Sequence, residues 1–251
     1  MKYKALILDV DGTLVANHGT AVPSQKVITA LTKAKDILHI GLATNRSFHL
    51  LTGIFASLPF LGPCIINGAT QIIDPKTRKV LWEQKINTED VSKILAIAEG
   101  LGIRMNLQGE ETAVLYSGEN MLGKILGLYT QPLSSTDVEK FLQAISEIKG
   151  ISAHKTSSWE GDKMHVSINH LNASKQYAVY ELAKILDITP EEIIGVGDHY
   201  NDFPLLMACG LKVAMGNAVD DLKSIADYIT SPVEGDGVAE VVEKFILREN
   251  I

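Results

Sequence analysis

The chain is organised around the stretch Ala5-Leu6-Ile7-Leu8-Asp9-Val10-Asp11-Gly12-Thr13-Leu14. Its apolar first half is typical of a buried parallel strand, which is covered on both faces. Because an unpaired charge is strongly unfavourable inside such a strand, Asp9 and Asp11 are expected at its C-terminal end. Open α/β sheets bind ligands at that edge. Gly12 permits a turn there, so both carboxylates could converge on one ion.

The same design returns far downstream, in the stretch Ile193-Ile194-Gly195-Val196-Gly197-Asp198-His199-Tyr200-Asn201-Asp202. A short apolar strand is again followed by glycine and then by acids. Taken alone, the first stretch fits an ordinary turn about as well, since Asp-Gly favours Asx-type turns in any protein. Two acid-tipped strands in one chain favour the other interpretation, which is a divalent-metal site with hard oxygen ligands.

The composition bounds the class of protein. A chain of 251 residues with 46% hydrophobic content suits one large domain or two modest ones with a packed core. The net charge of −7 argues against a nucleic-acid partner, which would favour a basic patch. Cys64 and Cys209 are expected to be buried free thiols, which fits a reducing cytosol.

Targeting signals are not evident at the start of the chain, which opens on a strand pattern without a signal-peptide layout. Residues 47–73 contain no Asp, Glu, Lys or Arg. Glycine and proline interrupt this stretch too often for a membrane span. We therefore expect a cytoplasmic protein without a membrane partner.

Hydrophobic periodicity predicts an α/β core that an α+β segment interrupts. The core elements expected before the interruption are a helix at 24–34, a strand at 38–43, a helix at 47–57 and a strand at 64–66. This βαβαβ pattern implies a doubly wound parallel sheet. Asn67-Gly68 is a strong turn signal, and residues 71–73 and 79–82 are expected to form an antiparallel hairpin.

The middle of the chain has a different pattern, in which a helix followed by two strands occurs twice. The elements expected there are helices at 88–101 and 136–149 and strands at 103–107, 112–116, 151–155 and 163–168. Such an arrangement predicts an α+β domain with a one-sided antiparallel sheet. The core pattern resumes at Ser174. We therefore expect a core formed by residues 1–82 and 171–251, with an inserted domain at 83–170.

Both acidic stretches resemble motifs of the haloacid dehalogenase-like phosphohydrolases. Asp-x-Asp-Gly-Thr-Leu at 9–14 looks like the first motif, and Gly-Asp-x-x-Asn-Asp at 197–202 looks like the fourth. The order of the remaining pieces resembles the Cof-type branch, which carries a large cap of the C2 kind. The resemblance implies a Rossmann-like core, a cap that selects the substrate, Mg²⁺ as cofactor and a small phosphorylated metabolite as substrate.

The resemblance also implies roles for the first two acids. Asp9 matches the nucleophile that forms an aspartyl-phosphate. Asp11 matches the general acid/base, and its main-chain carbonyl is expected on the metal. A Mg²⁺ ion would offset the repulsion between a carboxylate and a phosphate dianion. The alternative for Asp9 is an ordinary metal ligand in a signalling receiver, although receivers are far shorter than this chain.

Three residues after the second strand are candidates for substrate binding, and one of them, Thr44, matches the second motif of the family. Thr44 stands where a hydroxyl binds the phosphoryl oxygens, although a threonine at a strand end is also common as a helix N-cap. Asn45 replaces a glycine that is frequent in relatives. We expect Asn45 and Arg46 to contact the substrate, but Arg46 would equally suit a solvent-facing position.

The remaining site residues follow from the third and fourth motifs. Lys175 matches the lysine that neutralises charge on the phosphoryl group and Asp9, whereas an isolated lysine in a first helical turn is usually solvated. Gln176 stands where glycine is frequent. Asp198 is expected to ligate the metal directly, and Asp202 either to ligate it through water or to orient Lys175. Asn201 is expected to donate to the phosphate.

The leading function is therefore a Mg²⁺-dependent phosphomonoester hydrolase. A phosphosugar mutase resembling phosphomannomutase is an alternative, because it shares this core and cap type. A phosphate-binding regulator without catalysis is a second alternative. Candidate residues for substrate selection on the inserted domain are Arg104, Asn106, Tyr116, Lys163 and His165.

Overall fold

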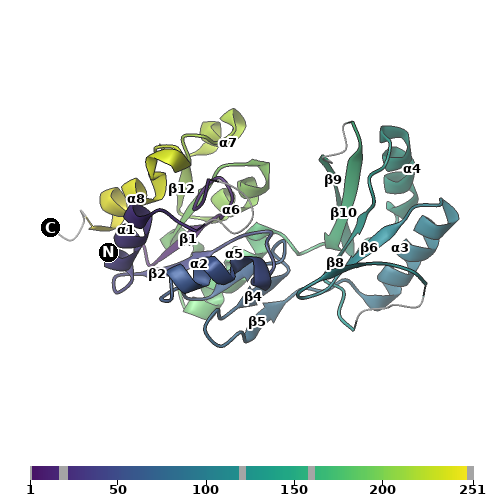
Figure 1. Cartoon of the computed structure of the whole chain (residues 1–251), viewed down its shortest axis with the longest axis horizontal. Coiled ribbons are helices and arrows are strands. Elements are labelled where there is room, and N and C mark those ends of the chain that lie inside the picture. Colours follow the sequence, from purple (N-terminus) through teal and green to yellow (C-terminus); the bar gives the residue numbers. More distant parts are fainter. Residues whose placement is uncertain (1, 17–21, 119–122, 158–161, 248–251) are drawn as a thin grey trace. The chain divides into compact units, whose positions relative to one another are not determined.

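The computed structural model describes residues 2–16, 22–118, 123–157 and 162–247. They form two compact units, Met1–Glu83 with Ser174–Ile251 and Gln84–Ala173 (Figure 1). The predicted fold class, an α/β core with an added α+β segment, is confirmed. The assignment of the first unit to catalysis and of the second to substrate choice stays a prediction. Within the described ranges, no helix has both the length and the apolarity that a bilayer crossing requires.

A five-stranded sheet forms the centre of the first unit. Its strand order is β13 (Tyr228–Ile229), β12 (Leu211–Ala214), β11 (Ile193–Gly197), β1 (Ala5–Leu8) and β2 (His39–Leu42). All neighbours pair in parallel. The predicted acid-tipped strands, β1 and β11, are central neighbours, so their carboxyl ends meet at one edge.

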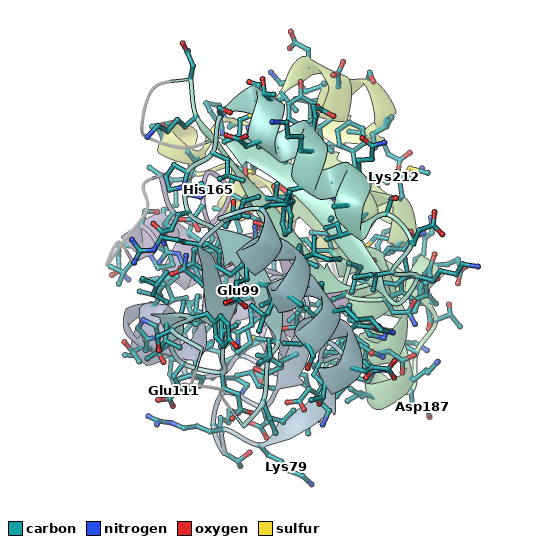
Figure 2. The ribbon with its side chains drawn as sticks, turned by 90° about the vertical axis from the view of Figure 1, so that its right-hand side faces the viewer. Lys79, Glu99, Glu111, His165, Asp187 and Lys212 are labelled. Carbon is teal, nitrogen blue, oxygen red and sulfur yellow. The ribbon has the colours of Figure 1, made fainter. Side chains whose placement is uncertain are left out.

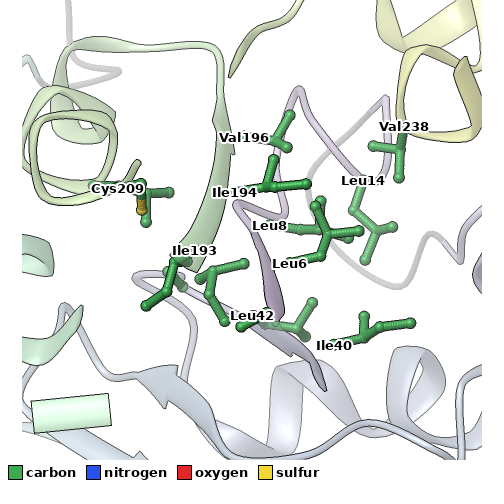
Figure 3. Close-up of a cluster of buried hydrophobic side chains, with 14 of the residues drawn as sticks. Leu6, Leu8, Leu14, Ile40, Leu42, Ile193, Ile194, Val196, Cys209 and Val238 are labelled. Atoms are coloured by element: carbon green, nitrogen blue, oxygen red, sulfur yellow. The ribbon is translucent and has the colours of Figure 1, made fainter. Parts of the chain in front are cut away.

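Apolar side chains cover both faces of this sheet. Parallel register places Leu6 beside Ile194 and Leu8 beside Val196, and all four are fully buried. Figure 3 shows these side chains on the side of the strands that faces Val238, with Cys209 on the other side. Cys209 packs over Gly195, where an added Cβ would lie 2.7 Å from its sulfur. Both cysteines are free and buried, as the sequence predicts.

Helices on the two faces of the sheet complete the first unit. They are α1 (Gln25–Ala34), α2 (Thr52–Ser57), α5 (Lys175–Leu186), α6 (Phe203–Ala208), α7 (Asp220–Ile225) and α8 (Gly237–Val242). Helix α1 packs against α8, and α5 packs against α6. Serines cap the two longest helices of this unit. The hydroxyl of Ser24 accepts from the N–H of Val27 at the start of α1, and that of Ser174 accepts from the N–H of Tyr177 at the start of α5.

Two predictions for the segment after β2 need correction. The helix expected at 47–57 is broken into a 3₁₀ turn, Phe48–Leu51, and the short α2. The Ser47 hydroxyl contacts the His49 ring at 3.0 Å and does not cap the helix, which leaves its start weak.

The strand β3 (Cys64–Ile66) does not continue the parallel sheet as a full strand. It meets β2 at one bridge, between Ala43 and Ile65. At Asn67 and Gly68 the chain turns back with positive φ, so β3 pairs instead with β4 (Gln71–Ile73). The predicted hairpin of β4 with β5 (Val80–Glu83) is confirmed.

The second unit is an antiparallel sheet with two helices on one face (Figure 1). The sheet order is β7 (Ala113–Leu115), β6 (Met105–Gln108), β8 (Gly127–Thr130), β10 (Met164–His170) and β9 (Ile151–Ser157). The helices are α3 (Thr88–Gly100) and α4 (Ser135–Ile145). Both predicted strand pairs form, and β8, which the prediction omits, lies between them. Charged side chains such as Glu99 lie on the exposed side of α3 (Figure 2).

Glu240, on α8, is held by donors from the segment that precedes the helix. The Ser231 hydroxyl donates to one carboxylate oxygen at 2.5 Å and the Ser231 N–H to the same oxygen at 3.1 Å, while the Tyr228 hydroxyl donates to the other. The hydroxyls of Ser231 and Tyr228 lower the pKa of Glu240 from 4.5 to about 2. These bonds therefore stabilise the fold only while the carboxylate is charged.

We expect Glu240→Gln to lower the free energy of unfolding at pH 7 by about 1 kcal/mol, since solvent screens part of the interaction. The native pKa lies below the unfolded one, so this contribution is present above about pH 4.5 and is lost as the pH falls through about 2. Urea unfolding across that range measures it. Glu243→Gln, which changes an exposed residue, is the matched control. If the loss of unfolding free energy in Glu240→Gln did not vary with pH, the charge of Glu240 would not be its cause.

Candidate active site

Two buried carboxylates stand side by side where β1 and β11 end. Asp9 follows the last residue of β1, and its N–H continues the ladder by donating to the carbonyl of Val196 at 2.9 Å. Asp198 directly follows β11. Asp9 is 5% exposed and Asp198 is 9% exposed. The parallel register of the two strands therefore brings together two acids that lie far apart in the sequence.

The loop after β1 is shaped to receive Asp198. Gly12 has a φ of +82°, and a Cβ added there would lie 2.2 Å from Asp198 Oδ2. The Thr13 hydroxyl donates to Asp198 Oδ1 at 2.9 Å. Only glycine fits at position 12, because its left-handed backbone and the approaching carboxylate both exclude a side chain.

Lys175 joins the acids of both strands. It is the first residue of α5, is 4% exposed, and its Nζ donates to Asp9 Oδ1 and to Asp202 Oδ1, each at 2.6 Å. The other oxygen of Asp202 accepts from the N–H groups of Asp198 and His199, at 2.9 and 3.0 Å. Asp202 is fully buried. Both of its oxygens therefore hold protein donors, as expected of a residue that orients Lys175.

Burial dominates the electrostatics of the cluster. It raises the pKa of Asp9 to about 7 against the opposing charge of Lys175, with Asp202 and Asp198 adding to the rise. Burial also raises the pKa of Asp198 to about 6, opposed by the hydrogen bond from Thr13. For Lys175, burial acts against the ammonium, but Asp9 and Asp202 keep its pKa above the ordinary value. One lysine is thus too little positive charge for three buried carboxylates.

The donor set fits a divalent cation. Asp9, Asp198 and Asp202 each offer an oxygen within 4.8 Å of the others. Among the described residues, none donates a hydrogen bond to Asp9 Oδ2 or Asp198 Oδ2, whereas Asp202 has a donor on each oxygen. Hard carboxylate oxygens with excess negative charge are what Mg²⁺ prefers. Asp9 and Asp198 are therefore the stronger candidates for ligands, with Asp202 behind them.

Of the three residues after β2 that are predicted to bind phosphate or substrate, Thr44 and Arg46 are buried and Asn45 is exposed. Thr44 is 1% exposed, and its hydroxyl oxygen accepts from the N–H of Arg46 at 3.1 Å, which leaves the hydroxyl hydrogen to donate elsewhere. Asn45 is exposed. Arg46 is buried and bonds both carboxylate oxygens of Asp11. The solvent-facing alternative for Arg46 is therefore wrong.

Asn201 lies on the exposed side of a 3₁₀ turn, Tyr200–Asp202, which places Asp202 inward. Its predicted bond to a phosphate stays a prediction. Asn217 has a role that sequence reasoning missed: its amide donates to the carbonyl of Gly12 at 2.8 Å and accepts from the N–H of Val233 at 2.9 Å. The signal in the sequence for this role of Asn217 is weak: the residue follows Gly216 in the loop after β12.

The five candidate residues of the second unit lie in different environments. Asn106 is buried on β6, and His165 is half-buried on β10, where its ring contacts the carbonyl of Thr130. Arg104 and Lys163 are exposed just before these strands. Tyr116 packs against the apolar core beneath the helices. Figure 2 labels His165.

Comparison with known proteins gives consistent matches along the chain. A family model described as haloacid dehalogenase-like hydrolase matches residues 6–134 and 120–242. Phosphoglycolate phosphatase 1 of Saccharolobus solfataricus is 27% identical over 247 residues, which are 98% of this chain and 97% of that protein.

Two solved structures share the fold. BT1666 from Bacteroides thetaiotaomicron, of the HAD enzyme superfamily, has a TM-score of 0.80 at 24% identity and covers 97% of this chain and 95% of its own. The sugar phosphatase BT4131, of HAD subclass IIB, has a TM-score of 0.74 at 21% identity, with 96% and 98% covered.

We expect Asp202→Ala to lower the free energy of unfolding by about 3–5 kcal/mol, because it strips one partner from the buried Lys175 and an acceptor from two N–H groups. Asp202→Asn should cost less, since its amide oxygen still accepts. Urea unfolding at pH 7 measures both. The exposed Asp36→Ala is the control and should stay within about 0.5 kcal/mol of wild type. If Asp202→Ala were as stable as this control, Asp202 would not be the stabilising partner of Lys175 and of the two N–H groups.

Proposed function

The chain belongs to the haloacid dehalogenase-like hydrolases, and we propose that it hydrolyses small phosphorylated metabolites through an aspartyl-phosphate on Asp9. It is a phosphoric monoester hydrolase. The observation that carries the proposal is the buried ion pair of Asp9 with Lys175, held by Asp202 beside Asp198. A carboxylate placed between a lysine and a cation-binding edge is equipped to attack a phosphoryl group.

In the first half-reaction an oxygen of Asp9 attacks phosphorus, and the ester P–O bond breaks. Asp11 gives a proton to the leaving oxygen, so that an alcohol departs. Lys175 offsets negative charge on Asp9 and on the phosphoryl oxygens. Asp9 and Asp198, with the main-chain carbonyl of Asp11, would hold Mg²⁺, which would neutralise part of the negative charge.

In the second half-reaction water attacks the same phosphorus, and Asp11 takes its proton. The bond between phosphorus and the Asp9 oxygen then breaks, which restores the carboxylate and frees inorganic phosphate. We propose that Thr44 donates its hydroxyl hydrogen to a phosphoryl oxygen. This is supported by the Arg46 N–H, which donates to the Thr44 oxygen and leaves its hydrogen available. Asn201 is proposed as a second donor, and Asn45 as a contact for the substrate.

We propose the substrate class from the names of similar proteins. One similar protein is named a phosphoglycolate phosphatase and another a sugar phosphatase. Sugar phosphates and 2-phosphoglycolate are therefore the first compounds to test. We propose that the second unit, Gln84–Ala173, selects among such esters.

We expect the wild-type chain to release inorganic phosphate from p-nitrophenyl phosphate and from at least one of these metabolites when Mg²⁺ is present. Asp9→Asn preserves shape but removes the nucleophile, so turnover should fall by at least about 10³-fold. Removal of the metal with EDTA should abolish turnover, and added Mg²⁺ should restore it.

The control for this experiment is Asp36→Asn, an exposed acid, which should keep wild-type turnover. After acid quenching, mass spectrometry should find the phosphate on the peptide that carries Asp9. Turnover in Asp9→Asn equal to that of wild type would refute the nucleophile. Transfer of phosphate within a sugar, without release of inorganic phosphate, would favour a mutase.

A further inference from the structure

Arg46 is buried against Asp11 in a two-bond fork. Its side chain is 7% exposed, its Nε donates to Asp11 Oδ2 at 3.0 Å, and its Nη2 donates to Asp11 Oδ1 at 2.5 Å. Two parallel bonds between planar groups fix the plane of the carboxylate as well as its position. Asp11 is thereby held in one orientation, with 23% of its side chain open to solvent.

The guanidinium is itself anchored by the chain around it. Its Nη1 donates to the carbonyl of Leu50 at 3.2 Å. The main-chain N–H of Arg46 donates to the Thr44 hydroxyl, and its carbonyl accepts from the N–H of Asn67 at 2.9 Å. A long side chain held at its base and its tip loses little further entropy when it orients a partner. Arg46 is thus a rigid support for Asp11.

Breaking this pair would be costly. An arginine this deeply buried leaves an uncompensated charge if its carboxylate swings away. The two-bond fork therefore holds the Arg46 guanidinium on Asp11. While it does so, fewer of the guanidinium N–H groups are available to donate to a phosphate. The geometry differs from that of Lys175, which faces Asp9 as a point charge and not as a fork.

We propose that Arg46 is a positioning residue that orients Asp11 for proton transfer, and not a ligand of the phosphoryl group. The inference rests on the proposed function, in which Asp11 protonates the leaving oxygen while the P–O ester bond breaks and the Asp9–phosphorus bond forms. A misoriented carboxyl group transfers that proton slowly, because general acid catalysis needs the donor within hydrogen-bond reach.

The leaving group separates this role from phosphate binding. p-Nitrophenolate departs readily without a proton, whereas an alkoxide needs one. Loss of a residue that positions the acid therefore slows the first step for an alkyl phosphate far more than for p-nitrophenyl phosphate. Loss of a phosphate ligand would slow both esters and weaken the inhibition by inorganic phosphate.

The experiment compares Arg46→Lys and Arg46→Gln with wild type on p-nitrophenyl phosphate and on the best alkyl phosphate, with Mg²⁺ present. Lysine keeps the charge but cannot form the fork, so Arg46→Lys should release the alcohol about 10²-fold more slowly. The burst of p-nitrophenolate, which reports the first step alone, should slow by less than about tenfold. The inhibition constant of inorganic phosphate should not change.

A double variant sharpens the comparison. In an Asp11→Asn background, Arg46→Lys should cause no further loss on the alkyl phosphate, because Arg46 acts only through Asp11. Arg78→Lys changes an exposed arginine of the same unit and should keep both rates at the wild-type level. If Arg46→Gln fails to fold, as thermal unfolding would show, Arg46→Lys still gives the answer.

Equal losses on both esters, with weaker phosphate inhibition, would make Arg46 a phosphate ligand and overturn the inference. Additive losses in the double variant would overturn it as well. In both cases the wild type still hydrolyses the esters, so the proposed function stands. A wild type that hydrolyses neither ester overturns the proposed function and this inference together.

Discussion

The structure of the first unit depends on a buried ammonium shared between two carboxylates. Lys175 bonds Asp9 and Asp202 at equal distances of 2.6 Å, in a place where none of the three is more than 5% exposed. Removal of one member of such a group leaves an unpaired buried charge, which costs about 3–5 kcal/mol. With Asp198 added, the cluster has more negative charge than the lysine can balance. This excess of negative charge is unfavourable without a cation, and it therefore favours the binding of a divalent cation.

The cluster is built from three separate parts of the chain: Asp9 follows β1, Asp198 and Asp202 follow β11, and Lys175 begins α5. Strands β1 and β11 end together, so the residues that follow them share one edge. The N-cap at Ser174 starts α5 at the right point for Lys175 to enter the cluster. Gly12 and Thr13 then fit the first loop around Asp198. Local preferences and pairing register act in the same direction here, which is typical of a well-specified site.

Much of this arrangement could be predicted from the sequence, because its signals are local. An apolar run that ends in acids marks a strand end, whichever strands later become neighbours. The fork between Arg46 and Asp11 and the bridge made by Asn217 could not be predicted, since each joins loops that are distant in sequence. β8 was missed because a four-residue strand beside residues of mixed polarity has weak periodicity. The break in the helix expected at 47–57 arises because the Ser47 hydroxyl contacts the His49 ring and does not cap the helix. The sequence alone does not distinguish these two contacts.

The acids that follow β1 and β11 are proposed to share one divalent cation. A crystal structure of the wild-type chain grown with Mg²⁺ would show whether they do. We expect one ion with an oxygen of Asp9 and an oxygen of Asp198 at about 2.0–2.1 Å, and Lys175 still bonded to Asp202. A structure in saturating Mg²⁺ with those two carboxylates apart and no ion between them would contradict it.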